Sequence, residues 1–422
     1  MPALIHNAVI IGGGPAGSAA AITLARHNIP VCLLERKTGP HDKVCGEFIS
    51  WEAAQYLQSL GIDLPALGAQ PIQRFKLYSG EQMLTTALPF TGWSLSRRRL
   101  DDALLRAAKV AGATVQTGAA VRKLQREEEA WNLSINRSCD KSLVGNKNKE
   151  PLAQQDWEEA HELSTETLRA RTVFLASGKH DLRCWSRVKQ SDNPGDVVGF
   201  KMHLTLTPVQ QELMRGIVEI HLFDGGYAGL ESVEDHKTNL CFLINKRIFL
   251  ACNRSWPNLL DWLGRTSSHM QQRLSGAVPL WQQPLAISGV PYGYLHSPSL
   301  VEPDLFRLGD QAAVIPSFAG DGIAMALHSG ILAARIYTEN TCTENTCAEN
   351  TCATDGAAGG NALAYHRQAM QDFQRQVRNA QRLEKMFSSR AGRKAALLLG
   401  RACPRLVTTA MMHTRIHPSL FL

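Results

Sequence analysis

The stretch from Asn7 to Arg36 constrains this chain most. It begins with the apolar run Ala8-Val9-Ile10-Ile11, continues through Gly12-Gly13-Gly14-Pro15-Ala16-Gly17 and a row of small residues, and ends with Val31-Cys32-Leu33-Leu34-Glu35-Arg36. This order predicts a strand, a glycine turn, a helix and a second strand that closes with an acidic residue. A glycine turn between such elements is typical of a dinucleotide site.

The glycines of this turn have separate tasks in such a site. Gly12 permits the tight turn, Gly14 lets backbone amides approach a pyrophosphate, and Gly17 lets the helix pack closely on the sheet. The phosphates then lie at the helix N-terminus, where unpaired amides and the helix dipole favour negative charge. Glu35 is placed to accept hydrogen bonds from the adenosine ribose. The predicted dinucleotide contacts are Gly12, Gly14, Ala16, Gly17, Glu35 and Arg36.

Length and composition limit the remaining possibilities. A chain of 422 residues with 44% hydrophobic residues is expected to form two connected domains that share one ligand. The net charge of +7 is mild and spread along the chain, so nucleic-acid binding is not expected. No apolar run approaches the roughly 18 residues that span a bilayer, and the first strand starts too early for a signal peptide. We therefore expect a cytoplasmic protein with free thiols.

Cys45 lies in the polar loop Gly39 to Ser50, just after the first strand-helix-strand unit. Two interpretations stay open for this residue. The neighbouring Lys43 favours the thiolate, which would make Cys45 a reactive group. Alternatively, Cys45 is a small residue that fills space beside a cofactor.

The glycine turn, Glu35-Arg36 and the loop Lys43-Val44-Cys45-Gly46 together resemble the opening of the geranylgeranyl reductase family of FAD-dependent oxidoreductases. In that family a K-x-C-G loop lies beside the flavin ring, so the resemblance implies FAD as cofactor and places Cys45 near the isoalloxazine. The family belongs to the glutathione-reductase-like flavoproteins. That group also contains monooxygenases of the para-hydroxybenzoate hydroxylase type.

Arg97 begins the next informative segment. Before it, Pro71 to Leu95 alternate weakly and contain two turn signals, Ser79-Gly80 and Thr91-Gly92, which predicts antiparallel strands of a second sheet. An amphipathic helix then opens with Ser96-Arg97-Arg98-Arg99. Cations oppose the helix dipole at this end, which favours an anionic ligand nearby. In the flavoprotein group an R-x-x-L-D helix start supplies an arginine to FAD, and Arg97 occupies that position.

Two segments depart from the pattern of related flavoproteins. Residues of about 136–168 are polar and aperiodic, which predicts a mobile insertion. After the buried strand Arg171 to Ala176 the chain reads Ser177-Gly178-Lys179-His180, where the monooxygenases usually carry Ala-Asp-Gly. This departure weakens the resemblance to a standard aromatic hydroxylase. Lys179 and His180 either contact phosphate or substrate, or cap the edge of the sheet.

The predicted substrate domain follows. Val198 to Leu204 and Ile217 to Phe223 alternate polar and apolar residues, which is typical of strands with one solvated face. In reductases of the resembling family a Y-x-W-x-F-P motif lines the cavity over the flavin. Here Tyr227 is present, but Ala228-Gly229-Leu230 replaces the bulky part, so we expect a wider cavity. The W-x-W-x-I-P motif of flavin halogenases is absent from the sequence.

A second glycine-rich signal completes the FAD site. Leu305 to Asp310 reads as a strand that ends in Gly-Asp, and Gly320-Asp321-Gly322 opens a helix of small and apolar residues. We expect Asp310 to accept hydrogen bonds from the ribityl chain. The helix N-terminus at Gly320 and Gly322 then stabilises negative charge on the reduced flavin.

The C-terminal part contains a tandem repeat and a basic amphipathic region. Glu-Asn-Thr-Cys recurs at 339, 344 and 349, and the repeat predicts a surface loop; metal binding by its cysteines is a less favoured alternative. Residues 363–387 form a predicted basic helix, and 395–422 mix apolar and basic residues. Two interpretations stay open: a lid that packs over the substrate domain, or a peripheral membrane contact.

These observations predict an α/β protein with a Rossmann-like, glutathione-reductase-type FAD-binding domain, a mixed β-sheet substrate domain and C-terminal helices. The FAD domain comprises 1–70, 96–196 and 291–338, the substrate domain 71–95 and 197–290, with a low-complexity loop at 339–360 and a helical region at 361–422. The expected activity is reduction or dehydrogenation of a large hydrophobic substrate, with Cys45 as a candidate catalytic residue and NAD(P)H or another reductant as electron donor. Flavin monooxygenation of an aromatic or olefinic substrate is the alternative.

Overall fold

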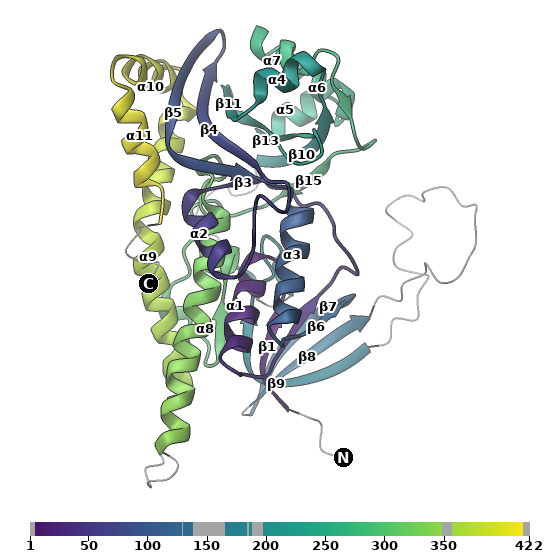
Figure 1. The fold of residues 1–422 in the computed structure, drawn as a ribbon, viewed down its shortest axis with the longest axis vertical. Helices are drawn as coiled ribbons and strands as arrows, with labels where there is room; N and C mark the ends of the chain where they lie inside the picture. The colour runs from purple at the N-terminus through teal and green to yellow at the C-terminus, as the bar shows by residue number, and fades with distance from the viewer. Residues whose placement is uncertain are drawn as a thin grey trace, which may run out of the picture.

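The structure is a computed structural model that describes residues 5–128, 130–137, 165–183, 185–187, 197–347 and 357–416. Two β-sheets lie one above the other in the long direction of the molecule, and two long helices run along one side of both (Figure 1). The predicted insertion at 136–168 falls mostly on residues 138–164, which lie outside the described residues.

The first sheet carries the predicted dinucleotide unit. Its strands follow the order β6-β2-β1-β9-β8-β7, and β16 also pairs with β9. The pairs that β1 makes with β2 and β9 are parallel, whereas β7, β8 and β9 are joined by antiparallel pairs. The strand bounds are β1 Ile5–Ile11, β2 Val31–Glu35, β6 Thr114–Thr117, β7 Ala119–Glu127, β8 Ala130–Arg137, β9 Thr165–Leu175 and β16 Leu305–Arg307.

Helices α1 (Pro15–Arg26), α3 (Arg97–Val110) and α8 (Gly322–Cys347) cover one face of this sheet (Figure 1). Small residues allow α1 and α8 to approach closely, since a Cβ at Gly330 would lie 2.2 Å from the carbonyl oxygen of Ala16. Because both faces of the parallel strands are covered, β1 is buried from Ala8 to Ile11. This packing fixes the glycine turn at the end of β1.

The second sheet has the order β14-β10-β13-β12-β11-β4-β5-β3, with β15 paired to β10. Most of its pairs are antiparallel, but β11 and β4 are parallel, so the sheet is mixed as predicted. The strand bounds are β3 Phe48–Ile49, β4 Gln70–Ser79, β5 Gln82–Ser94, β10 Val197–Thr205, β11 Ile217–Phe223, β12 Gly226–Ser232, β13 Thr238–Asn245, β14 Val278–Pro279 and β15 Leu285–Ser288. Short helices α4 (Pro208–Met214), α5 (Lys246–Ala251), α6 (Trp256–Gly264) and α7 (Ser268–Leu274) surround it, and α2 (Trp51–Ser59) lies between the sheets (Figure 1).

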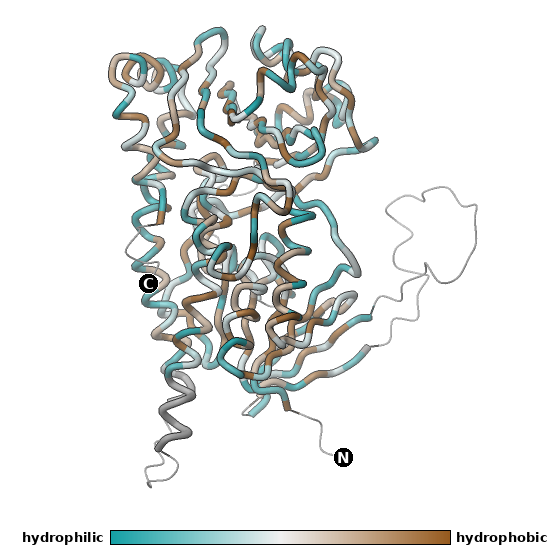
Figure 2. Tube along the Cα trace, in the orientation of Figure 1, coloured by the Kyte–Doolittle hydropathy of each residue, from teal (hydrophilic) through white to brown (hydrophobic). Residues whose placement is uncertain are grey.

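The C-terminal helices link the two sheets. Helix α9 (Ala357–Ser388) runs beside α8 and carries interleaved hydrophobic and hydrophilic residues (Figure 2). Helices α10 (Arg390–Ala402) and α11 (Pro404–His413) then pack on β4 and β5, where Leu397 joins Leu77 and Leu84 in one apolar cluster. The fold class predicted from the sequence is therefore confirmed.

Three sequence expectations differ from the structure. Thr91-Gly92 is not a turn but lies within β5, where a Cβ at Gly92 would come within 2.7 Å of the Phe48 ring. The range 339–360, predicted as a loop, is helical through Cys347 and again from Ala357, because extending a packed helix costs less than starting one. The side chains of the repeat from 340 onward lie outside the described residues.

The third difference concerns the strands expected to have one solvated face. Lys201 and His203 of β10 are buried, and so are Glu219 and His221 of β11. The polar side chains of these strands are paired inside the protein: Glu219 bonds to Arg273 at 2.9 Å and 2.8 Å, which offsets the cost of burial. Alternation here reflects internal ion pairs instead of contact with water.

Candidate active site

A cavity of about 1150 Å³ lies between the two sheets and connects both glycine motifs. Most residues predicted to bind the cofactor line it: Gly12, Gly14, Ala16, Glu35, Arg36, Cys45, Arg97, Asp310, Gly320 and Gly322. Gly17 does not line the cavity. A Cβ at that position would lie 2.0 Å from the carbonyl oxygen of Gly12, so its role is the close packing of helix and strand.

The glycine turn leaves no room for side chains on the strand side. Gly12 has a φ of +107°, and a Cβ there would lie 2.4 Å from the carbonyl oxygen of Ala176. Glu35 is fixed next to this turn, since its carboxylate accepts hydrogen bonds from the amides of Gly13 at 2.8 Å and Lys37 at 3.0 Å. Its predicted contact to a ribose stays a prediction.

Two cations lie beside Gly14. A Cβ at Gly14 would be 3.6 Å from Nη2 of Arg97 and 4.0 Å from Nζ of Lys43. Both cations pair with Asp101, each at 2.8 Å. Burial alone would raise the pKa of Asp101, but these cations lower it to about 2. Two positive charges on one carboxylate leave an excess of positive charge at the turn, which fits a pyrophosphate.

Cys45 is half-buried and lines the cavity, as the resemblance implied. Its sulfur accepts a hydrogen bond from the amide of Glu47 at 3.4 Å. The carbonyl oxygens of Cys45 and Gly46 both accept from Nδ2 of Asn239, at 3.2 Å and 2.8 Å, which fixes the loop against β13. Lys43 forms its salt bridge with Asp101, and both interpretations of the thiol stay open.

The second glycine motif closes the opposite side of the cavity. Gly320 has a φ of +70°, and a Cβ there would lie 3.1 Å from the Phe48 ring. Asp321 is buried at the start of α8 and accepts from Ser50 at 3.0 Å and from the amide of Ile416 at 3.1 Å. Burial raises the pKa of Asp321 to about 7, although Arg415 opposes the shift. Asp321 thus connects the helix start to the C-terminal segment.

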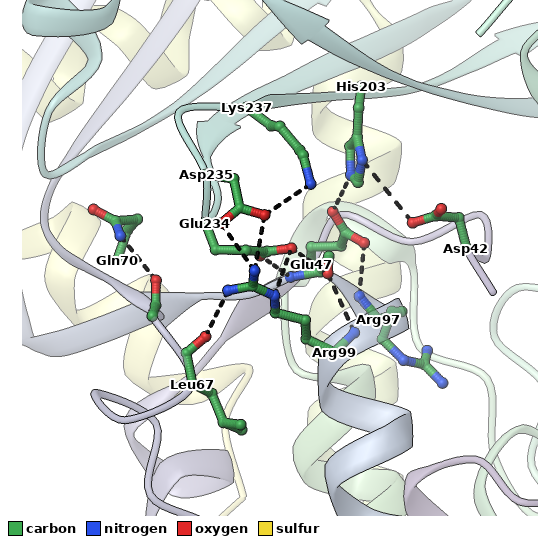
Figure 3. Close-up of polar contacts among 12 residues, drawn as sticks. Asp42, Glu47, Leu67, Gln70, Arg97, Arg99, His203, Glu234, Asp235 and Lys237 are labelled. Carbon is green, nitrogen blue, oxygen red and sulfur yellow. Dashed lines mark hydrogen bonds and ion pairs between the residues drawn. The ribbon is translucent and has the colours of Figure 1, made fainter. Parts of the chain in front are cut away.

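A buried charged network that the sequence did not indicate surrounds Glu47 and includes Asp42, Arg97 and His203 (Figure 3). Glu47 is fully buried, accepts from Lys201 and, at 2.8 Å, from the amide of Arg97, and lies 2.7 Å from Nε2 of His203. Burial opposes ionisation of Glu47, but Lys201 and His203 outweigh it and lower its pKa. Glu47 also has a φ of +63°, a strained value for this residue type. The hydrogen bonds and ion pairs of the network keep Glu47 in this strained backbone conformation.

Asp42, Glu47 and His203 together have the donor set of a metal site. The ammonium of Lys201 already lies against Glu47 and 3.9 Å from Asp42, so a positive charge occupies this position without a metal ion. We therefore interpret the group as an ion-pair network that fixes the Cys45 loop to β10.

The face of the second sheet that carries Gly229 and Glu231 has apolar residues on one side of β12 and mostly polar residues on the other. Strand register places Gly229 beside Ile220 and Leu77 on one side, and Glu231 beside Val218 and Phe75. On the other side of β12 the same rows continue with Cys241 and Lys201, and with Asn239 and His203. The side chains of this face are therefore apolar on β4 and β11 and mostly polar on β13 and β10. Of the β13 and β10 residues in these rows, Cys241 lines the cavity, together with Gly199 of β10 and Phe242 and Leu243 of β13.

The apolar part of the cavity extends to the C-terminal helices. Its outer wall is formed by Leu84 and Leu88 of β5 and by residues of α9 to α11, among them Met386, Leu399, Val407, Ala410 and Met411. Hydrophobic side chains thus line the cavity from the two glycine motifs to helices α10 and α11.

Residues 6–176 match the FAD binding domain family model, and the chain has the corresponding α/β fold. The glycine turn that excludes Cβ atoms and the cations beside it fit the pyrophosphate of that cofactor.

Particular relatives differ in what they do. Menaquinone reductase from Mycobacterium tuberculosis is 28% identical over 162 residues, which cover 35% of this chain and 39% of that protein. The flavin-dependent brominase Bmp2 has a TM-score of 0.73 at 15% identity, with 99% and 97% of the chains covered. A geranylgeranyl bacteriochlorophyll reductase-like protein from Thermoplasma acidophilum has a TM-score of 0.69 at 16% identity, covering 99% and 94%. At these identities the structural likeness shows the fold alone.

Among the helices in the described part of the chain, none combines the length and the apolar character needed to cross a bilayer.

Proposed function

We propose that this protein is an FAD-dependent reductase of a large, hydrophobic, unsaturated substrate of polyprenyl or polyketide type. The observation that carries the proposal is the continuity of the cavity: one space of about 1150 Å³ joins the two glycine motifs to a wall of apolar side chains. A cavity of this size exceeds what a drug-sized ligand requires, so it accommodates both a cofactor and a bulky partner.

The residues that would hold FAD come from both motifs. These residues line the cavity, and in a complex with FAD the Gly12 to Gly14 turn and the nearby Arg97 would contact the pyrophosphate, Asp310 the ribityl chain, and the start of α8 the flavin. When bound, FAD supplies hydride transfer, and NAD(P)H or another reductant recharges it. The protein's own contribution is to bind, orient and exclude water.

Two features support a hydrophobic substrate. The wall formed by β4, β5 and β11 presents Phe75, Leu77 and Leu84 to the cavity, with few polar groups among them. The sequence match to menaquinone reductase favours an unsaturated lipid-type substrate. Gly229 adds space because it has no side chain. A Cβ there would lie in ordinary contact, 3.4 Å from Cδ1 of Ile220, so the position also tolerates a larger residue.

Substrate access at a membrane surface follows from the same helices. Leu398, Leu399 and Leu406 of α10 and α11 are 62%, 57% and 52% exposed, and Leu399 also lines the cavity. The exposed cations Lys394 and Arg405 lie on these same helices. Apolar and basic side chains on one helical region favour an anionic bilayer surface. We propose that α10 and α11 contact such a surface and receive the substrate there.

An anaerobic half-reaction tests the reductase proposal. Purified, FAD-loaded protein is reduced under nitrogen and mixed with polyprenyl or polyketide-type acceptors that contain conjugated double bonds or quinones. Rapid flavin reoxidation with formation of the reduced product is expected. Reoxidation by these acceptors no faster than in their absence refutes the proposal.

Monooxygenation is the second candidate, because the resembling flavoprotein group contains such enzymes. The segment Ala176 to Lys179 argues against it, since Ser177 stands where those enzymes usually have aspartate, and Lys179 donates to the carbonyl of Val44 at 2.8 Å. Oxygen consumption coupled to hydroxylation or epoxidation of the substrate would favour this alternative.

A further inference from the structure

Glu231 is the feature of the cavity that the proposed function leaves unexplained. Its side chain is 2% exposed, it lines the cavity, and neither carboxyl oxygen has a hydrogen-bond partner among the described residues. A buried carboxylate without a partner costs several kcal/mol, so such a group is protonated or reserved for a ligand.

The position of Glu231 in strand β12 shows that its side chain lies on the face that borders the cavity. Because alternate residues of a strand share a face, Glu231 lies on the same face as Tyr227 and Gly229, both of which line the cavity. In register, Val218 is its neighbour on the apolar side and Asn239 on the polar side. The Oδ1 atom of Asn239 is also buried without a partner. Glu231 thus has an apolar neighbour on one adjacent strand and a polar neighbour on the other.

The charges around Glu231 favour its neutral form. Burial raises its pKa well above the usual value, and the carboxylate of Glu47 and the thiol of Cys45 act in the same direction. The cation Lys201 opposes the shift but is paired with Glu47. A carboxylic acid that stays protonated near neutral pH is suited to donate a hydrogen bond or a proton.

We infer that Glu231 is the proton donor of this enzyme and acts on the hydrophobic substrate as a neutral acid. The inference rests on the proposed reductase function. In that reaction one end of a polarised double bond receives a hydride supplied by reduced FAD, and the π electron pair forms a bond to a proton at the other end. The O–H bond of Glu231 breaks to supply that proton, and the carboxylate left behind regains a proton from water. The substrate is reduced by two electrons.

The apolar wall explains the orientation of the substrate. A chain that lies against Phe75 and Leu77 extends toward Glu231, because Phe75, Val218 and Glu231 follow one another in one row across the sheet and all three line the cavity. Cys45 is then free to line the cofactor side without a role as acid. The structure therefore assigns the role of proton donor to Glu231, which follows Cys45, the candidate from the sequence, by more than a hundred positions.

Infrared spectroscopy of the FAD-loaded protein tests the neutral state directly. At pH 7 the wild-type protein is expected to show the carbonyl band of a protonated carboxylic acid that Glu231→Gln lacks. Glu234→Gln is the matched control, since Glu234 is equally buried but bonds to Ser96 at 2.9 Å and pairs with Arg99. That control keeps the band. The inference is overturned if the wild-type spectrum in the carboxylic-acid carbonyl region is identical to the spectrum of Glu231→Gln.

The reduction step is measured next. Glu231→Gln is expected to slow anaerobic product formation by about 10²- to 10⁴-fold while flavin reduction by the electron donor keeps its rate. In D₂O the wild-type product carries one solvent deuterium at the carbon that receives the proton. A variant rate within threefold of the wild type overturns the assignment. If the wild-type enzyme itself reduces no acceptor, the proposed function fails, and the infrared band still reports whether Glu231 is neutral.

Discussion

Replacing Glu47 by Gln tests whether the buried network stabilises the site. Glu47 and Lys201 are both fully buried, and the carboxylate also accepts from the amide of Arg97 at 2.8 Å and faces His203 at 2.7 Å. Gln keeps the shape of the side chain but removes the charge. Within 4 Å, and among the described residues, the ammonium of Lys201 then keeps Asp42, at 3.9 Å, as its ion-pair partner.

The expected cost follows from that uncompensated charge. Removing one partner of a buried ion pair typically destabilises a protein by about 3–5 kcal/mol. Replacing both partners by neutral groups is often close to neutral, so Glu47→Gln combined with Lys201→Met should recover most of the loss. The pKa of Glu47 is lowered in the folded protein, so its contribution is present above its unfolded pKa and disappears as the pH falls. The stability of Glu47→Gln should therefore change less than that of the wild type as the pH falls below 4.5, the ordinary pKa of a glutamate.

Urea unfolding of the FAD-free proteins, followed by tryptophan fluorescence, measures these differences. Glu212→Gln is the matched control, because Glu212 forms a surface pair with Arg215 and is 65% exposed at its side chain. That control should stay within about 0.5 kcal/mol of the wild type. The reasoning is refuted if Glu47→Gln unfolds like Glu212→Gln, or if adding Lys201→Met brings no recovery.

Four further outcomes are expected. Arg97→Leu should weaken FAD affinity about 10- to 100-fold in a fluorescence titration, because a charged hydrogen-bond donor is lost beside Gly14; unchanged affinity would contradict the predicted phosphate contact. Gly229→Phe should fold like the wild type but raise KM for bulky acceptors more than for small ones, because its ring fills the cavity; equal effects would argue against substrate in that space. Charge reversal at Lys394 and Arg405 should reduce co-sedimentation with vesicles of anionic lipid, whereas reversal of the exposed Lys123 on β7 should not; equal loss in both would argue against the α10 and α11 surface. Asp321→Asn should flatten the loss of stability as the pH rises from 3.8 to about 7, because the raised pKa of Asp321 makes its ionisation unfavourable in the folded state; a slope like that of the wild type would contradict this.

The FAD half of the fold was predictable because its signals are local. Gly12, Gly14 and Gly17 form one short motif between a strand and a helix, and Glu35 follows at the end of the next strand, although the backbone that Gly12 approaches belongs to Ala176. The two glycine motifs are far apart in sequence, yet each is recognisable alone. Their meeting at one cavity follows from the parallel pairing of β1, β9 and β16.

The remaining site could not be read from local patterns. Lys201 and His203 alternate with apolar residues in β10, which is also the pattern of a solvated strand. Their partner Glu47 lies in a loop before β3, more than a hundred residues earlier, so nothing near them in sequence indicates burial. Gly92 was misread for a similar reason, since the Phe48 ring that requires it belongs to another strand.

Glu231 shows where sequence and structure must be combined. Ala228-Gly229-Leu230 in place of bulky residues predicts a wider cavity, but nothing in the local sequence indicates a role for the acid directly after them. Register explains why the two features belong together: Gly229 and Glu231 share one face of β12, the first leaving space and the second facing it. A bulky side chain at Gly229 would fill the space next to the acid. A double-mutant comparison follows, in which Gly229→Phe and Glu231→Gln are expected to be non-additive in the rate of reduction, because a substrate displaced by the ring no longer reaches the proton. Additive effects would place the substrate away from β12 and refute the shared role.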